Sequence, residues 1–181
     1  IMQALPLLPV EEEGRLMDPV LRENFIERVF VYHRWQSLCE SELTPAKLID
    51  FHTNHKFSVL AHDEAAYREL GQMVAEAGSA DLLQLRERYA TLLMMAMKKR
   101  ATRKLHSNVL THIMGFLKDK IDSGDKAELL EVIEKYRHGQ IPLIVPITLL
   151  KHHLRRYPDP YIARQSYLNP HPEELMLRNS L

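Results

Sequence analysis

Two histidines and a lysine lie close together in the sequence HTNHK, which spans residues 52–56. On a helix, where successive residues are about 100° apart, His52, His55 and Lys56 share a side with Phe51 and Val59. Titratable groups that face a core are costly unless they have partners or line a cavity. The sequence leaves two interpretations open: three side chains that are each satisfied separately, or a polar pocket inside a helical bundle.

A pocket of this kind could perform acid–base chemistry, because a histidine near its ordinary pKa and a desolvated lysine both exchange protons readily. His106 lies on the apolar side of another predicted helix and could complete the pocket if the fold brings it close. The candidate catalytic residues are therefore His52, His55, Lys56 and His106. We predict no metal site, because Lys56 would repel a cation and two histidines three residues apart are weak evidence for one.

Positive charge is strongly segregated along the chain. The 24 basic and 24 acidic residues cancel overall, yet residues 88–118 contain seven Lys or Arg and two His without any carboxylate. Residues 135–158 contain five Lys or Arg and three His, again without a carboxylate. This segregation favours a positive face that attracts anionic partners such as nucleic acid.

Polar side chains accompany these cations in a pattern typical of phosphate contacts. On the helix predicted over 102–118, basic and amide side chains lie opposite the apolar side, and the helix predicted over 146–157 is divided in the same way. A solvated basic surface would explain the pattern about equally well. The candidate residues for binding nucleic acid or another anion are Lys98, Lys99, Arg100, Arg103, Lys104, Asn108, Lys118, Lys151, His152, Arg155 and Arg156.

Composition excludes several classes of protein. The chain has 181 residues, of which 45% are hydrophobic, enough for one compact domain. Its only cysteine, Cys39, excludes a disulfide framework, a cysteine-based zinc site and a self-contained iron–sulfur cluster, and it fits a cytoplasmic location. No apolar run approaches the roughly 18 residues needed to span a bilayer, so we expect no membrane association. No nucleophile or phosphate-loop motif is present.

The elements that must position these residues are predicted to be helices throughout. Asp18-Pro19 and Thr44-Pro45 each place a capping oxygen before a proline, which is a helix start signal. The predicted helices cover about 18–40, 44–61, 63–77, 79–99 and 102–118, then a sixth that ends at 139, a seventh over 146–157 and a short eighth that begins at the PDP turn. The fold class is therefore all-α, a compact bundle of about seven or eight helices.

Two further segments complete the predicted organisation. Residues 141–145 are apolar with Pro142 among them and Pro146 after them, which favours extended geometry at Ile141 and Val145 and a buried crossing segment. Residues 1–17 contain two prolines and three consecutive glutamates. We expect them to form an extended arm or linker from a preceding domain, and residues 18–181 to form the helical domain.

Four blocks of this sequence resemble a known family. FHTNHKF, ATRKLHSNVLTHIMGF, IPLIVPITLLKHHLRRYPDPY and YLNPHPEELMLRN are similar to the YbgA-like domain, a bacterial domain of unknown function. The resemblance covers roughly residues 25–179. In many bacteria this domain stands alone, and in others it follows an iron–sulfur domain of the thiouracil desulfidase type. ALPLLPVEEEGRLMDPVLRENF resembles the junction in those fused proteins, which together with the first residue, Ile1, suggests a piece of a longer protein.

The resemblance implies a parent protein that removes sulfur from thiouracil or 4-thiouridine, with its iron–sulfur cluster in the preceding domain and no cofactor in this chain. It implies no catalytic residue here. We therefore expect a recognition module for tRNA or a thiolated nucleotide that assists a desulfidase domain in cis or in trans. Two alternatives stay open: an enzyme that uses the inward-facing histidines and lysine, or a structural domain for dimerisation or docking.

Overall fold

The computed structural model describes residues 5–175 and 177–179, and within them every regular element is a helix. The α-helices are α1 (Pro19–Glu40), α2 (Pro45–His62), α3 (Glu64–Ala75), α4 (Leu82–Lys98), α5 (Arg103–Gly115), α6 (Ser123–Arg137), α7 (Ile144–Arg156) and α8 (Pro160–Ala163), and the 3-10 helices are η1 (Glu13–Met17), η2 (Ser166–Leu168) and η3 (Glu173–Leu175). The predicted all-α class is confirmed. None of the described helices is long and apolar enough to cross a membrane.

The helices begin where side chains can cap them. The Asp18 carboxylate accepts hydrogen bonds from the backbone N–H groups of Val20 and Leu21, at 2.8 and 3.1 Å. The Thr44 and Thr102 hydroxyl oxygens cap α2 and α5 in the same way. Each cap satisfies a backbone donor that has no partner inside the helix, so these predicted starts are confirmed to within a residue.

Some predicted boundaries are wrong. α4 begins at Leu82, with Asp81 as its cap, rather than directly after Ser79. α7 begins at Ile144 rather than at Pro146, so Val145 is helical and 39% exposed instead of extended and buried. A proline fits here because the first N–H groups of a helix need no intrahelical partner. α5 ends at Gly115 rather than at residue 118, because Phe116 and Leu117 donate to carbonyls three residues back and the chain leaves the α-helical path.

The predicted N-terminal arm is not wholly extended. Residues 1–4 lie outside the described residues, and η1 forms one 3-10 turn that packs against α1. Leu7 lies against the core that α1–α4 enclose.

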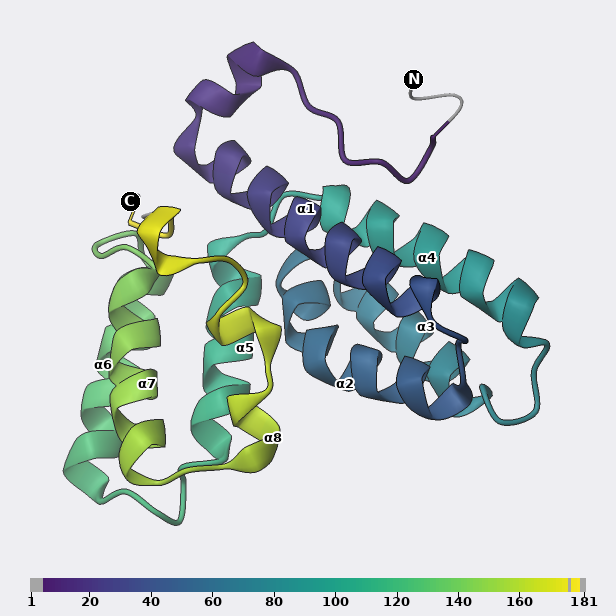
Figure 1. Ribbon diagram of the computed structural model, residues 1–181. Coiled ribbons are helices and arrows are strands. Elements are labelled where there is room, and N and C mark those ends of the chain that lie inside the picture. Colours follow the sequence, from purple (N-terminus) through teal and green to yellow (C-terminus); the bar gives the residue numbers. More distant parts are fainter. Residues whose placement is uncertain (1–4, 176, 180–181) are drawn as a thin grey trace.

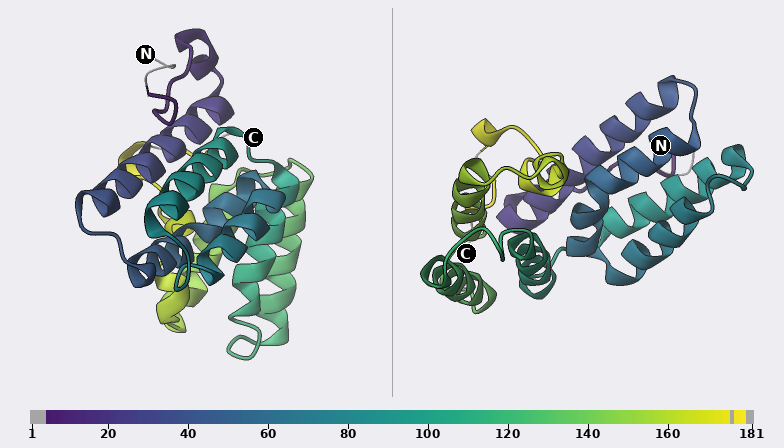
Figure 2. Two further views of the ribbon diagram at one scale, coloured as in Figure 1. Left: turned by 90° about the vertical axis from the view of Figure 1, so that its right-hand side faces the viewer. Right: turned by 90° about the horizontal axis from the view of Figure 1, so that it is seen from below.

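The helices enclose two hydrophobic cores that share α2. Figures 1 and 2 show α1–α4 on one side of the molecule and α5–α8 on the other. Leu48 and Phe51 of α2 belong to the first core, whereas Phe57 and Leu60, two turns further along, belong to the second. Side chains four residues apart recur on one face of a helix, and α2 uses neighbouring faces for the two cores. α2 therefore contributes apolar side chains to both halves.

Candidate functional site

The predicted basic residues are divided between the two ends of the α5–α7 half. At one end Arg103 lies against Gly139, which follows α6: a Cβ built on Gly139 would be 3.1 Å from Arg103 Cζ. At the other end, Lys120 follows α5 and Asp159 follows α7. Lys120 Nζ lies 3.6 Å from Asp159 Oδ2, so the ends of the two helices are close. Arg155 therefore lies about one helix length, roughly 20 Å, from Arg103. The predicted residues do not form one continuous groove.

Ion pairs neutralise only some of these cations. Lys99 pairs with the Asp63 carboxylate, and Lys151 Nζ lies 2.9 Å from Glu173 Oε1. The Arg156 guanidinium lies over the Tyr157 ring, 5.4 Å from its centroid. Asn108 is half-buried, not exposed. Among the described residues no ion pair involves the other predicted cations: Lys98, Arg100, Arg103, Lys104, Lys118, His152, Arg155 and Arg156.

The four predicted catalytic residues do not share a pocket. His52 Nδ1 is 3.1 Å from the hydroxyl of Tyr89, His55 Nδ1 donates to the backbone carbonyl of its own helix at Phe51, and His106 Nδ1 is 2.9 Å from the hydroxyl of Tyr167. Lys56 Nζ lies 5.0 Å from the centroid of the Tyr161 ring.

Burial controls the charge of these histidines. Desolvation lowers the pKa of His52 and of His55 to about 4, and the pKa of His106 to about 3. All three are neutral at pH 7, so at that pH they act as hydrogen-bonding groups. No group of three or more His, Cys, Asp or Glu among the described residues is placed to hold a metal ion.

A cavity of about 500 Å³ opens where α5 begins, and we call it the α5 cavity. Residues from the start of α1, the connection from α4 to α5 and the end of α6 line it, and Figure 1 shows where these helices lie. The arginines that line it are Arg100, Arg103, Arg137 and Arg178. Within the described part of the chain, Glu23 is the only acidic residue that lines the cavity with them, so the lining residues carry a positive excess.

Three of the arginines are exposed and lie at the cavity's solvent side. Arg100 and Arg103 have no ion pair within the described chain, and Arg137 has one exposed pair, 3.4 Å from Glu134. The N-terminus of α5 adds a partial positive charge and backbone N–H groups, of which Thr102 caps only that of Leu105. Together these groups suit a phosphate.

The inner wall of the α5 cavity carries three polar groups: the Glu23 carboxylate, the His106 imidazole and the Tyr136 hydroxyl. They are largely buried: the Glu23 side chain is 12% exposed, and His106 and Tyr136 are 6% and 5% exposed as whole residues. All three residues line the cavity. His106 Nδ1 already contacts the Tyr167 hydroxyl, and Glu23 Oε1 already pairs with Arg178.

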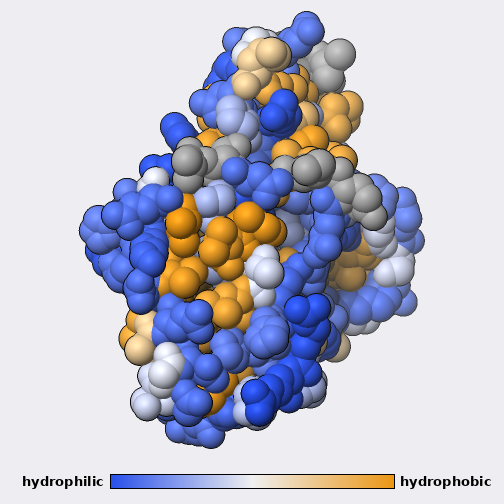
Figure 3. All heavy atoms as spheres, turned by 90° about the vertical axis from the view of Figure 1, so that its left-hand side faces the viewer, coloured by the Kyte–Doolittle hydropathy of each residue, from blue (hydrophilic) through white to orange (hydrophobic). Residues whose placement is uncertain are grey.

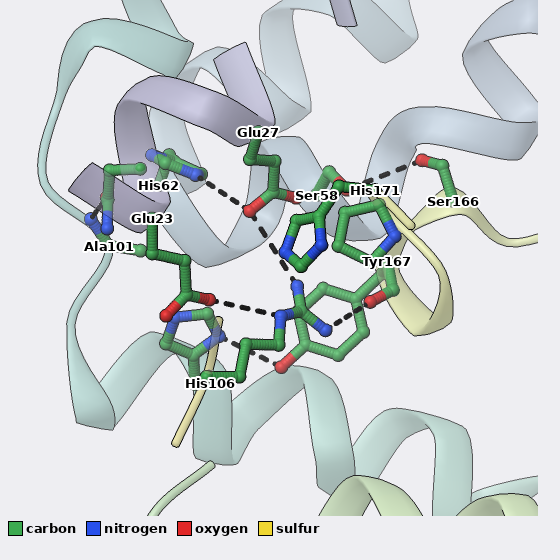
Figure 4. A network of polar contacts seen from close by, with 12 residues as sticks. Glu23, Glu27, Ser58, His62, Ala101, His106, Ser166, Tyr167 and His171 are labelled. Carbon is green, nitrogen blue, oxygen red and sulfur yellow. Dashed lines mark hydrogen bonds and ion pairs between the residues drawn. The ribbon is translucent and has the colours of Figure 1, made fainter. Parts of the chain in front are cut away.

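Behind this wall lies a network of buried charges around Arg178 (Figure 4). Arg178 Nε lies 3.1 Å from Glu23 Oε1, and Arg178 Nη2 lies 3.7 Å from Glu27 Oε2. Arg178 Nη1 also donates to the backbone carbonyl of Tyr167 at 2.7 Å. His62 Nε2 approaches Glu27 from the other side, at 3.7 Å. The C-terminal segment is thereby attached to α1, the helix that supplies Glu23 to the cavity.

The two carboxyls of this network differ in acidity. Burial raises the pKa of Glu23 above its ordinary value, and the Arg178 charge opposes that effect only in part. Burial would also raise the pKa of Glu27, but the nearby His62 imidazole and the Arg178 charge hold it well below the ordinary value of 4.5. Glu27 is therefore the firmly ionised partner of Arg178.

Sequence reasoning found part of this site. Arg100, Arg103 and His106 were predicted; Glu23, Tyr136, Arg137 and Arg178 were not. A signal existed in α1, where Glu23, Glu27, Val31 and Trp35 follow one another at intervals of four, so the two acids continue a buried stripe. Arg178 has no such signal, because it reaches α1 from 155 residues away in the sequence.

A larger groove, of about 710 Å³, lies between α7 and the C-terminal segment. Its lining is mostly apolar, and one of its cations, Lys151, is already paired. On the side of the molecule that Figure 3 shows, where α6 and α7 lie, hydrophobic atoms gather between hydrophilic ones. We favour the smaller α5 cavity as the functional site, because exposed arginines and largely buried polar residues line it together.

Comparisons with known proteins place the chain in a family. Residues 56–172 match a family model described as "Protein of unknown function (DUF1722)". The chain is 33% identical to "Uncharacterized protein YbgA" of Escherichia coli (strain K12) over 159 residues, which are 87% of this chain and 94% of that protein. No solved structure matches. The family match includes the α5 and α6 residues of the cavity but neither Glu23 nor Arg178.

Proposed function

The chain belongs to the DUF1722 family of YbgA-like proteins, and we propose that it is an RNA-recognition module that binds a nucleotide of tRNA in the α5 cavity. The observation that carries this proposal is the cluster of Arg100, Arg103 and Arg137 around the N-terminus of α5, with Glu23 as the only carboxylate among the described residues that line the cavity. A volume of about 500 Å³ falls in the range of sites for small ligands. One nucleotide can therefore enter while the rest of the strand stays outside.

Exposed lysines extend the same positive region. Lys98 and Lys104 are close in sequence to Arg100 and Arg103, which line the cavity, and they have no ion pair within the described chain. Phosphates that neighbour the bound nucleotide can contact them, and such contacts add affinity without sequence preference.

The resemblance to the domain that follows a desulfidase directs the choice of nucleotide. A thiolated uridine is therefore the first nucleotide to test. In this proposal the chain presents that nucleotide to a desulfidase domain in cis or in trans. An enzymatic role for His52, His55, Lys56 and His106 is less well supported, since the first three lie away from the cavity and each contacts a different partner.

Charge reversal at the two ends of the α5–α7 half tests the proposal. We expect R100E/R103E to weaken tRNA binding at least tenfold. It should also make the salt dependence shallower, by roughly 0.7–0.9 log units per log unit of salt for each phosphate that the variant no longer binds. R155E/R156E removes the same charge at the far end and should change binding no more than about threefold. Filter binding at two salt concentrations, with circular dichroism to verify folding, measures both.

Equal weakening in the two variants would assign binding to overall charge and overturn the cavity as the site. Competition by 4-thiouridine monophosphate against uridine monophosphate then tests the choice of base. No preference between the two would reject the thiolated nucleotide and would not affect the recognition of RNA.

A further inference from the structure

The α5 cavity contains a carboxylate that a simple phosphate site does not need. Glu23 would repel a phosphate placed next to it. Glu23 is not the only carboxylate that neutralises Arg178, because Glu27 Oε2 lies 3.7 Å from Arg178 Nη2. Arg178 occupies some of the hydrogen-bond acceptor positions of the Glu23 carboxylate, through Nε at 3.1 Å and through its backbone N–H. A carboxylate can accept about four hydrogen bonds, so Glu23 retains acceptor capacity beyond its contacts with Arg178, and Glu23 lines the cavity.

The arrangement of charge within the cavity has a direction. The exposed arginines lie towards solvent, whereas Glu23, His106 and Tyr136 are largely buried and form the inner wall. An ionised carboxylate only accepts hydrogen bonds, and a phenol both donates and accepts. The inner wall therefore suits an uncharged group with hydroxyl donors, and the outer part suits the phosphate attached to it.

A ribose has this combination of groups next to its phosphate. We propose that Glu23 accepts a hydrogen bond from the 2′-hydroxyl of the nucleotide whose phosphate lies among Arg100, Arg103 and Arg137, so that the cavity selects ribonucleotides over deoxyribonucleotides. This inference rests on the proposed function. The 2′-hydroxyl is the group by which a protein distinguishes RNA from DNA at a given site. Loss of a hydrogen bond to a charged acceptor weakens binding about 10- to 100-fold.

The first test changes only the ligand. A single-stranded RNA is compared with the same sequence carrying 2′-deoxy or 2′-fluoro sugars, and the wild-type protein is used throughout. We expect both modified strands to bind at least tenfold more weakly than the RNA. A fluorine can accept a weak hydrogen bond but cannot donate one, so its effect separates a carboxylate acceptor from an arginine donor. Full affinity for the 2′-fluoro strand would overturn the proposal.

The second test changes Glu23. In Glu23→Gln the ratio of RNA to DNA affinity should fall from tenfold or more to about threefold or less. Binding of DNA should stay the same or strengthen, because a negative charge leaves a positive cavity. A merely structural role would weaken binding of both polymers equally and leave the ratio unchanged. Glu131→Gln is the matched control: it removes an exposed carboxylate of α6 that does not line the cavity, and the ratio should persist.

Failures of the two proposals are distinguishable. Equal binding of RNA and DNA that is abolished in R100E/R103E overturns the role of Glu23 and preserves nucleic-acid recognition. Absence of binding to either polymer overturns both.

Discussion

Two buried carboxylates share one guanidinium at the junction of the helices. Glu23 and Glu27 lie one turn apart on α1, and Arg178 contacts both. Arg178 is 4% exposed, and its φ of 72° lies in the left-handed region that residues other than glycine rarely adopt. A backbone held in this region is tolerated only where the surrounding contacts fix it. The two ion pairs and the hydrogen bond to the Tyr167 carbonyl are those contacts.

Replacing Arg178 with methionine should therefore destabilise the protein strongly. The variant leaves two buried carboxylates without a cation, and breaking a buried pair in this way costs about 3–5 kcal/mol. Urea unfolding at pH 7 measures the change. Lys151→Met is the control, since that lysine pairs with the exposed Glu173 and should cost no more than about 1 kcal/mol. A destabilisation by Arg178→Met as small as the control's would contradict the assigned role.

The pH dependence of the same variant follows from the acidity of Glu27. Its pKa in the folded protein is below the ordinary value of 4.5, so ionised Glu27 contributes stability above pH 4.5 that is lost as the pH falls further. Without Arg178 part of this contribution disappears, because the Arg178 charge is one of the causes of the low pKa of Glu27. The difference in unfolding free energy between wild type and Arg178→Met should therefore shrink as the pH falls below 4.5, because a protonated carboxyl needs no cation. Urea unfolding at several pH values measures it, and a difference that stays constant would contradict the assignment.

At the scale of elements, the end of α6 fixes the position of a cavity arginine. Gly139 has a φ of 75°, and the Arg103 guanidinium lies where a side chain at Gly139 would project. A left-handed conformation costs a residue other than glycine about 1–2 kcal/mol. The glycine thus serves both the turn after α6 and the close approach of Arg103.

We expect Gly139→Ala to lower the unfolding free energy by about 1–2 kcal/mol and to weaken RNA binding, because the new methyl group displaces Arg103. Thermal unfolding and filter binding give the two values. Gly115→Ala is the matched control at the other end of α5, where a Cβ meets nothing within 4 Å, and it should leave both unchanged or slightly improved. RNA affinity that is unaffected in Gly139→Ala would remove Arg103 from the binding site.

Local signals in the sequence were sufficient for most helices and insufficient for the site. Capping residues such as Asp18 and Thr44 act within one turn, so the sequence alone predicted where α1 and α2 begin. The start of α7 was misjudged because Pro146 was treated as its first residue, when it occupies the first turn. The inner wall of the cavity depends on the packing of α1, α6 and the C-terminal segment against α5. No local pattern encodes the meeting of Glu23 with Arg178.

At the scale of the whole molecule, shared residues couple the two cores. α2 supplies Phe51 to one core and Phe57 to the other. The charge network crosses the same boundary, since Arg178 from the C-terminal segment holds Glu27 of α1. Unfolding one half would expose apolar side chains of α2 and leave buried charges without partners. The free energy of separating the halves should therefore be high.

This coupling predicts one cooperative unfolding transition for both halves. Trp35 is the only tryptophan and is buried in the first core against Phe51 and Tyr89, so its fluorescence reports on α1–α4 alone, whereas far-UV circular dichroism reports on all helices. Leu110→Ala, in the second core, should cost about 2–5 kcal/mol and shift both signals to the same lower urea midpoint. Leu93→Ala, equally buried in the first core, should behave alike. A Trp35 midpoint that stays at the wild-type value in Leu110→Ala would show that the halves unfold independently, since the damage would then remain confined to α5–α8.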